Sequence, residues 1–181
     1  TLNIPSPTPD PTGGQSPNAD LADWKTYSNE KFKYQVMYPP TWTARENNML
    51  SSDFVSFKSP DIQGNDSTGV VGIMAEKMTT SVTTDSDALL QFQTFMDSCS
   101  PSTPTQCTEK VKDVYKLEKQ MTVNGRLVFQ TYGGCCLDIG RHIFIYNNDI
   151  RYRITLYNLD PSSANLKNES EFDQILSTFR F

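Results

Sequence analysis

Hydrophobic and polar residues alternate along much of the chain, and this pattern predicts β-strands with one buried face. The clearest case is the stretch 32–38, where every second residue is aromatic or aliphatic: Phe32, Tyr34, Val36 and Tyr38. Pro39 and Pro40 end this strand because proline cannot donate to a strand ladder. Further strands are predicted at 41–46, at 53–60 and at 70–78, and the last is apolar enough to be central.

The dipeptide Asn124-Gly125 predicts a β-hairpin, since Asn-Gly is the strongest two-residue turn signal. The turn joins the stretch 112–123 to the stretch 126–132. The expected register pairs Val123 with Arg126, Met121 with Val128 and Leu117 with Tyr132.

A second hairpin is predicted around Asn148-Asp149, between 141–147 and 150–158. Its register places Ile145 opposite Tyr152 and Ile143 opposite Ile154 on one face. The other face carries the pairs Tyr146 with Arg151 and Phe144 with Arg153. A slip of one residue would mix the two faces, so the hydrophobic pattern itself selects this register.

Two amphipathic helices are predicted from apolar residues at helical spacing. The first begins at a capping box from Thr84 to Asp87, ends near Cys99, and has the apolar stripe Ala88, Leu89, Phe92, Phe95 and Met96. The second is expected to begin with Asn168 as its N-cap, and its stripe is Phe172, Ile175, Leu176 and Phe179. Together these elements predict an α+β fold, in which an antiparallel sheet built from hairpins is flanked by helices.

The first twenty residues differ in composition from the rest. They contain five prolines and two adjacent glycines and no aromatic residue, so they cannot bury enough apolar surface to offset the entropy of ordering. We therefore predict that 1–20 is a disordered, proline-rich linker and that 21–181 is one globular domain. The linker is interpreted as a stalk that holds the domain away from a membrane anchor; an ordinary disordered terminus is the alternative.

Charge and hydropathy exclude some classes of function. The net charge is -5, the isoelectric point is about 4.8 and the mean hydropathy is -0.51. A general nucleic-acid-binding protein is usually basic, because neutralising phosphates supplies most of its affinity, so no nucleic-acid partner is expected. No apolar run approaches the roughly 20 residues that cross a bilayer. Any attachment to a membrane would be through an anchor upstream of Thr1.

Four cysteines, Cys99, Cys107, Cys135 and Cys136, favour an oxidising compartment over the cytosol. Free cysteines in a buried core are the alternative. The spacing lacks the short Cys-x-x-Cys arm of structural zinc sites. We predict two disulfides that join Cys99 and Cys107 to the adjacent pair Cys135 and Cys136, with either crossing allowed.

The opening and the close of the predicted domain carry two sets of spaced residues: Tyr27, Asn29, Phe32, Tyr34, Tyr38, Pro39 and Trp42, and then Phe172, Ile175, Leu176, Thr178 and Phe179. In these residues the chain resembles the PsbP-like family. That family includes the extrinsic PsbP subunit of photosystem II and many bacterial surface lipoprotein domains. The resemblance implies that the opening block is the first strand pair of the sheet, with a corner at Pro39-Pro40 and Trp42 covering the core. The arrangement of the cysteines differs from that expected of the photosynthetic subunit, so the role of that subunit in photosystem II is not carried over to this chain.

Three further groups of residues have side chains that could support catalysis or binding. His142 is the only histidine and would have to serve any catalytic system that uses one, but its position in a strand is simpler to interpret as a surface residue of the hairpin. Oxygen-bearing side chains in the loop 61–68 suggest a weak calcium site or a solvated turn. Finally, Phe144, Tyr146, Arg151 and Arg153 form either an aromatic and cationic binding face or a sheet face covered by a helix, with arginines stacked on rings.

The sequence favours a non-enzymatic binding or scaffold domain, displayed outside the cytoplasm on a stalk. Its partner is expected to be a protein or a component of the cell envelope, and no cofactor is expected. A structural subunit of a cell-surface assembly is one alternative. An enzyme with an unrecognised site near His142 is another.

Overall fold

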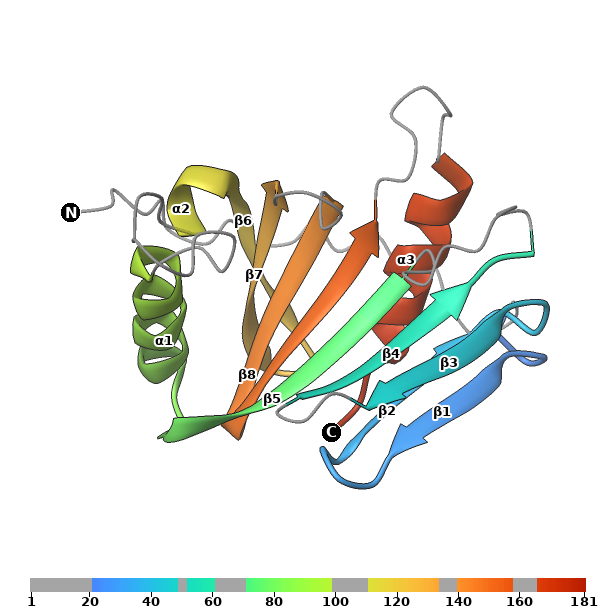
Figure 1. Cartoon of the computed structure of the whole chain (residues 1–181), viewed down its shortest axis with the longest axis horizontal. Helices are drawn as coiled ribbons and strands as arrows, with labels where there is room; N and C mark the ends of the chain where they lie inside the picture. Colours follow the sequence, from blue (N-terminus) through green and yellow to red (C-terminus); the bar gives the residue numbers. More distant parts are fainter. Residues whose placement is uncertain (1–20, 49–51, 61–70, 99–110, 134–139, 158–165) are drawn as a thin grey trace.

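The chain forms two antiparallel sheets and three helices within the part that the structure describes (Figure 1). The structure is a computed structural model, and it describes residues 21–48, 52–60, 71–98, 111–133, 140–157 and 166–181. The predicted stalk, the loop 61–68 and all four cysteines lie outside these residues. The predicted α+β class with an antiparallel sheet is confirmed.

The larger sheet has the strand order β3-β4-β5-β8-β7-β6, and every neighbouring pair is antiparallel. The strands are β3 (Thr43–Asn48), β4 (Ser52–Lys58), β5 (Val71–Val82), β6 (Tyr115–Val123), β7 (Arg126–Gly133) and β8 (Gly140–Tyr157). β5 lies inside the sheet, as its apolar sequence predicted, and β3 and β6 form the two edges.

The element β8 consists of two arms that fold back on each other at Asn148, which has a positive φ of 54°. Residues 140–145 pair with β7, while residues 150–156 pair with β5 (Figure 1). The side chains of His142 and Thr155 meet across the two arms. These two residues stand opposite each other in the register that was predicted from Ile143 and Ile154.

The hairpin at Asn124-Gly125 follows the predicted register close to its turn and departs from it farther away. Both turn residues have positive φ, as this type of tight turn requires. Val123 pairs with Arg126 and Met121 with Val128. The predicted pair Leu117 with Tyr132 is wrong, because an irregularity between Leu117 and Lys119 shifts the ladder and pairs Leu117 with Thr131.

The first strand pair forms a sheet of its own, so the prediction that it opens the main sheet is wrong. β1 (Lys25–Asn29) pairs with β2 (Tyr34–Tyr38) in a two-stranded sheet. This small sheet is connected to the C-terminal segment, because Gln35 and Arg180 exchange two backbone hydrogen bonds of 2.9 Å. The proline corner is present, since the Trp42 amide donates to the Pro39 carbonyl at 3.0 Å.

Helix α1 (Asp85–Asp97) begins as its sequence predicted. Thr84 is the N-cap, and a complete capping box joins it to Asp87. The short helix α2 (Val111–Val114) precedes β6. Helix α3 (Leu166–Thr178) begins two residues before Asn168, so the prediction of Asn168 as its N-cap is wrong.

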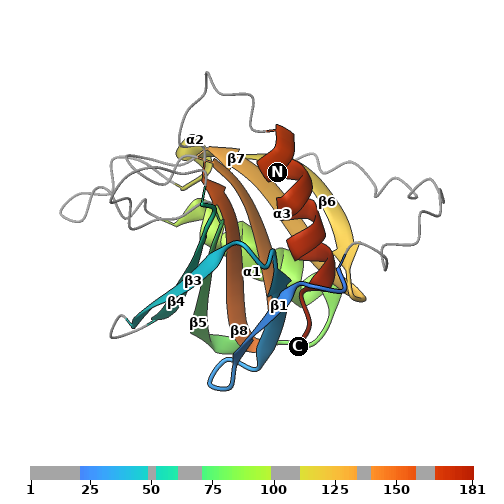
Figure 2. The ribbon, with the colours of Figure 1, turned by 90° about the vertical axis from the view of Figure 1, so that its right-hand side faces the viewer.

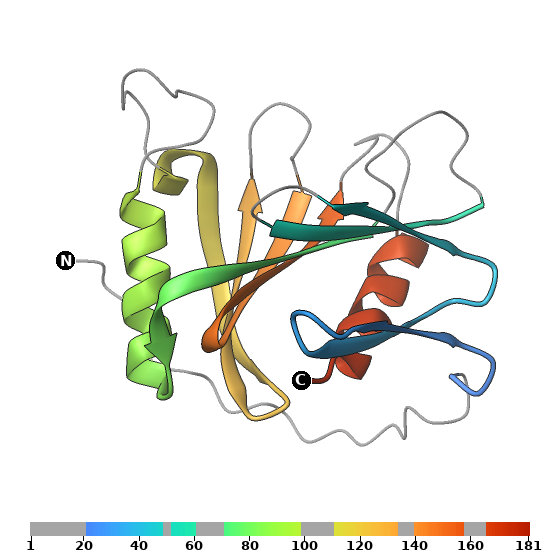
Figure 3. The same ribbon diagram turned by 60° about the horizontal axis from the view of Figure 1, so that its bottom comes forward.

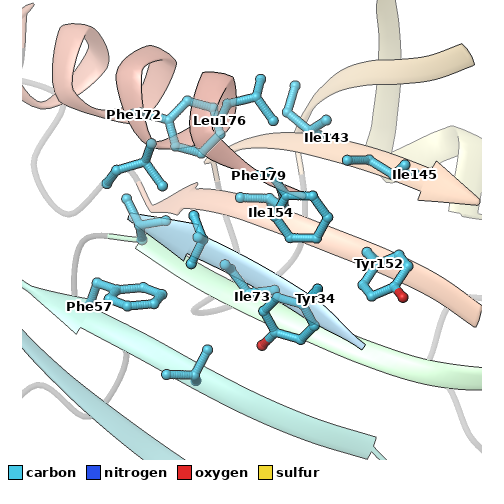
Figure 4. Close-up of a cluster of buried hydrophobic side chains, with 14 of the residues drawn as sticks. Tyr34, Phe57, Ile73, Ile143, Ile145, Tyr152, Ile154, Phe172, Leu176 and Phe179 are labelled. Carbon is cyan, nitrogen blue, oxygen red and sulfur yellow. The ribbon is translucent and has the colours of Figure 1, made fainter. Parts of the chain in front are cut away.

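The two faces of the main sheet carry separate hydrophobic clusters, because successive side chains of a strand point to opposite faces. On one face, Ile143 and Ile145 of β8 pack with α3 and the small sheet (Figure 4). On the other face, Phe144 and Tyr146 pack with α1. Figure 3 shows strands of the main sheet between α1 and α3. Figure 2 shows the curvature of the sheet around α3.

Candidate functional site

The four residues of the predicted aromatic and cationic face lie together on the side of the sheet that α1 partly covers. Phe144 and Tyr146 are buried beneath the helix. Phe95 of α1 packs against Phe144 with ring centroids 5.0 Å apart. Arg151 and Arg153 are half-buried at the border of this covered area. The geometry thus combines both interpretations, since a helix covers the aromatic residues and the arginines remain partly accessible.

Arg151 is held in place from two sides. Its guanidinium lies 4.3 Å from the ring centroid of Phe95, which is a cation–π contact. It also forms an ion pair with Glu76 on β5, the residue directly opposite it in the ladder. Both members of the ion pair are half-buried, so water and salt screen their charges less than those of a fully exposed pair. Arg151 therefore contributes a fixed, internally balanced charge.

Arg153 reaches across the sheet. Its Nη1 donates to the hydroxyl of Tyr115 at 3.2 Å, and Nη2 lies 4.0 Å from the sulfur of Met74. Tyr115 begins the edge strand β6, and its ring packs edge-on against His142. The guanidinium of Arg153 therefore contacts side chains from two other strands, β5 and β6.

These side chains surround a cavity of about 320 Å³ between α1, α2 and the sheet. Ligand pockets in proteins usually measure about 300 to 1,000 Å³, so the volume suits a small molecule or a single large side chain. The cavity is lined by Met74, Glu76, Phe95, Val111, Tyr115, Phe144, Arg151 and Arg153.

A second, wider hollow of about 510 Å³ adjoins the first beside α1. The two share Glu76, Phe95, Val111 and Arg151 in their walls. Tyr146 borders the second hollow, and burial raises the pKa of its hydroxyl, so that the phenol stays neutral at physiological pH. We call the two hollows together the α1 groove. The groove has an apolar floor, and the Glu76–Arg151 ion pair lies where the hollows meet.

The walls of the first hollow carry the guanidinium groups of Arg151 and Arg153 and the carboxylate of Glu76. The remaining walls are aromatic or aliphatic. Such a surface can enclose an apolar body and orient a polar group. Among the described residues, no group of three or more histidine, cysteine or acidic side chains could hold a metal ion.

His142 does not lie on the surface, and that prediction is wrong. Its side chain is fully buried beneath Tyr115. Its Nε2 lies 3.0 Å from the carbonyl oxygen of Gly133, and its Nδ1 lies 3.0 Å from Oγ1 of Thr155. A carbonyl can only accept, so Nε2 donates, and Nδ1 of the neutral ring accepts from the Thr155 hydroxyl. Both ring nitrogens are thus engaged inside the fold, out of reach of a substrate.

Five wall residues of the first hollow were not identified as site residues from the sequence: Met74, Glu76, Phe95, Val111 and Tyr115. Glu76 and Met74 face the groove because they share a face of β5 and stand opposite Arg151 and Arg153. The alternation in β5 indicates that Met74 and Glu76 share a face of the strand. It does not indicate that β8 is the neighbouring strand, so their pairing with the two arginines could not be predicted. Phe95 was predicted to lie on the apolar stripe of its helix, but the sequence did not indicate which residues it contacts. No sequence pattern near Tyr115 indicated that its side chain would line a cavity.

Comparisons with known proteins return structural similarity only. No family model matches the sequence, and no curated protein matches it. Among solved structures, the solution structure of cyanobacterial PsbP from Synechocystis sp. PCC 6803 is similar with a TM-score of 0.49 and 16% identity, over 94% of this chain and 99% of that one. A crystal structure from Bacteroides thetaiotaomicron has a TM-score of 0.42 and 15% identity; the match covers 87% of this chain and 48% of that one.

At these identities, the comparison concerns the arrangement of the backbone and transfers no activity, ligand or partner. None of the described helices is long and apolar enough to cross a membrane.

Proposed function

We propose that this chain is a non-enzymatic binding domain and that the α1 groove is its binding site. The observation that carries the proposal is the cavity of about 320 Å³ whose walls combine aromatic rings with two arginines. Aromatic residues and arginine are the types that dominate binding energies at recognition surfaces. We further propose that the domain works outside the cytoplasm at the end of its proline-rich segment, in keeping with the composition of residues 1–20.

The arrangement of the polar groups favours recognition over catalysis. Glu76 is paired with Arg151, and the hydroxyl of Tyr115 accepts from Arg153. These contacts fix the shape and charge of the walls before any ligand arrives. A preorganised site loses less entropy on binding than a mobile one, which is the property that a binding domain requires.

The proposal is tested with the neutral fluorescent probe N-phenyl-1-naphthylamine, whose emission rises in an apolar site. We expect saturable binding of one molecule to the wild-type domain. Met74→Trp should abolish this binding, because the larger side chain fills the hollow that Met74 lines. Leu90→Trp is the matched control, since Leu90 is 59% exposed on α1.

Residue-level NMR shifts on addition of the probe provide the second measurement. They should cluster on α1, β5 and β8. Absence of saturable binding, or equal binding by Met74→Trp and the wild type, would refute the groove as the binding site.

A further inference from the structure

We infer that the α1 groove recognises an apolar ligand that carries an uncharged carbonyl group, as in a ketone or an amide, and that the hydroxyl of Tyr146 donates a hydrogen bond to this carbonyl. This inference rests on the proposed function of the groove. It adds the chemical class of the ligand and the residue that distinguishes a carbonyl compound from a purely apolar one.

The hydroxyl of Tyr146 is buried and has no hydrogen-bond partner among the described residues. Only 1% of the surface of Tyr146 is exposed, and a phenol carries one O–H that it can donate. A buried hydroxyl without a partner destabilises a fold, because it has given up its hydrogen bonds to water. Most buried polar groups in native proteins have a partner, so the position of this one points to a role in binding.

The hydroxyl of Tyr146 lies close to the place where the two hollows of the groove meet. The ring is held from inside the fold, since it packs edge-on against Phe129 with centroids 6.2 Å apart. Tyr146 lines the second hollow. After burial, the influences on the pKa of its hydroxyl come from Arg151 and Glu76, which line both hollows.

The oxygen of Tyr146 is covered by its neighbours in this structure. A ligand in the second hollow therefore reaches it only if side chains of the wall rearrange. Such rearrangements of side chains are common on binding.

The neighbours of the Tyr146 hydroxyl favour a ligand group that accepts a hydrogen bond. The guanidinium of Arg151 supplies N–H donors close by, and the carboxylate of Glu76 is engaged in its ion pair with Arg151. Burial raises the pKa of Tyr146, so the phenol is neutral and keeps its proton for donation. The complementary group on a ligand is therefore an acceptor.

The charges in the second hollow favour an acceptor without a net charge. Arg151 is balanced by Glu76, and Lys77 forms an ion pair with Asp149 at 4.0 Å. An anion beside Tyr146 would lose its hydration and also approach the carboxylate of Glu76, which would repel it. A carbonyl oxygen accepts the same hydrogen bond at a much smaller cost of desolvation.

The apolar body of the ligand follows from the walls that the two hollows share. Phe95 and Val111 line both hollows, and Phe144 and Met74 line the first. Phe95 and Phe144 pack together with ring centroids 5.0 Å apart. An apolar body would fill the first hollow while its carbonyl reaches Tyr146 from the second.

The test uses the neutral fluorescent ketone 6-propionyl-2-dimethylaminonaphthalene, whose emission moves to longer wavelength when its carbonyl accepts a hydrogen bond. We expect saturable binding to the wild-type domain, in competition with N-phenyl-1-naphthylamine, which has no carbonyl. Tyr146→Phe removes only the hydroxyl. It should lower the affinity for the ketone, relative to that for N-phenyl-1-naphthylamine, by about threefold to tenfold. It should also shift the emission of the bound ketone to shorter wavelength.

Tyr38→Phe is the matched control, because Tyr38 of β2 packs with the cluster on the opposite face of the main sheet. This variant should bind both probes as the wild type does, with the same emission. Urea unfolding without a probe gives an independent readout. Since the Tyr146 hydroxyl has no partner among the described residues, Tyr146→Phe should be at least as stable as the wild type.

The outcomes separate the two proposals. If N-phenyl-1-naphthylamine binds but the ketone does not, or if Tyr146→Phe leaves the relative affinity and the emission unchanged, the inference is overturned and the binding groove stands. A Tyr146→Phe domain that is clearly less stable than the wild type would reveal a structural partner of the hydroxyl and would also overturn the inference. So would an equal loss of ketone binding in Tyr38→Phe. If neither probe binds the wild-type domain, the proposed function itself is overturned.

Discussion

The Nδ1 atom of His142 lies 3.0 Å from Oγ1 of Thr155, and both residues are buried in the middle of the main sheet. The contact links the two arms of β8 on the face that α1 partly covers. Thr155→Val keeps the shape of the side chain and removes the hydroxyl. We expect it to lower the free energy of unfolding by about 1 to 3 kcal/mol, because a ring nitrogen is left without its partner in a buried site.

Urea unfolding of Thr155→Val, followed by circular dichroism, measures this cost. Thr43→Val is the matched control, since Thr43 is exposed on the edge strand β3. Equal stability of the two variants would show that the His142 contact contributes nothing.

Trp42 should be among the most important core residues, as only 1% of its surface is exposed. Trp42→Ala is expected to cost about 3 to 5 kcal/mol through lost burial and the cavity left behind. Trp24→Ala should cost clearly less, because Trp24 is only half-buried. Thermal melting of both variants decides the question, and a Trp42→Ala protein that melts like the wild type would contradict the assignment of Trp42 to the core.

Stability should fall in alkaline solution. Burial, followed by the nearby charge of Asp149, raises the pKa of Tyr152 to about 12, from an ordinary value of about 10. The folded state thus holds this proton more tightly than the unfolded state does. The stabilisation is complete below pH 10 and is lost as the pH rises from 10 to about 12.

Tyr152→Phe should reduce the slope of stability against pH in that window. It should also be less stable at neutral pH, because the hydroxyl donates to the Phe32 carbonyl at 2.7 Å. Unfolding curves at several pH values test both effects. An unchanged alkaline slope would show that Tyr152 does not titrate as expected.

Gly133 permits a close approach between β7 and the start of β6. Its φ is 135°, and a Cβ atom there would collide with the carbonyl oxygen of Val114. Gly133→Ala should therefore cost more than the roughly 1 to 3 kcal/mol of backbone strain alone. Gly125→Ala is the control, since Gly125 also has a positive φ but open space around its Cβ position. Similar melting temperatures for the two variants would refute the steric argument.

All four cysteines lie outside the described residues, so the disulfides stay a prediction from the sequence. We expect two disulfides between the pair Cys99 and Cys107 and the pair Cys135 and Cys136 in protein exported to an oxidising compartment. Each should contribute about 2 to 4 kcal/mol. Non-reducing peptide mapping with thiol alkylation reveals the bridges. Four alkylated thiols would refute them, and a single bridge between Cys99 and Cys107 would refute this connectivity.

The sequence predicted the hairpins and α1 well because their signals are local. Asn124-Gly125 and the capping box at Thr84 act over a few residues, and both appear as expected. The shift at Leu117 could not be predicted, since a bulge depends on the neighbouring strand. The separate small sheet was also missed, because alternation in a strand identifies its buried face but not the sheet that it joins.

The candidate site illustrates the same limit. The register of β8 placed Phe144, Tyr146, Arg151 and Arg153 on one face, and the structure has them there. His142 shares this face by the same period of two, and that signal could have indicated burial. The partners Glu76, Phe95 and Tyr115 come from distant segments, and only the tertiary fold brings them to the groove.

The backbone bridge between Gln35 and Arg180 has a consequence for how the protein matures on the ribosome. The hairpin of β1 and β2 emerges early, but Tyr34 stacks on Phe179 and the Met37 amide donates to Thr178. The apolar side of that hairpin therefore stays uncovered until residues 178–180 have been synthesised. Nascent chains halted before α3 should be bound by chaperones and cut readily by proteases, whereas chains that include Arg180 and have been released from the ribosome should resist both.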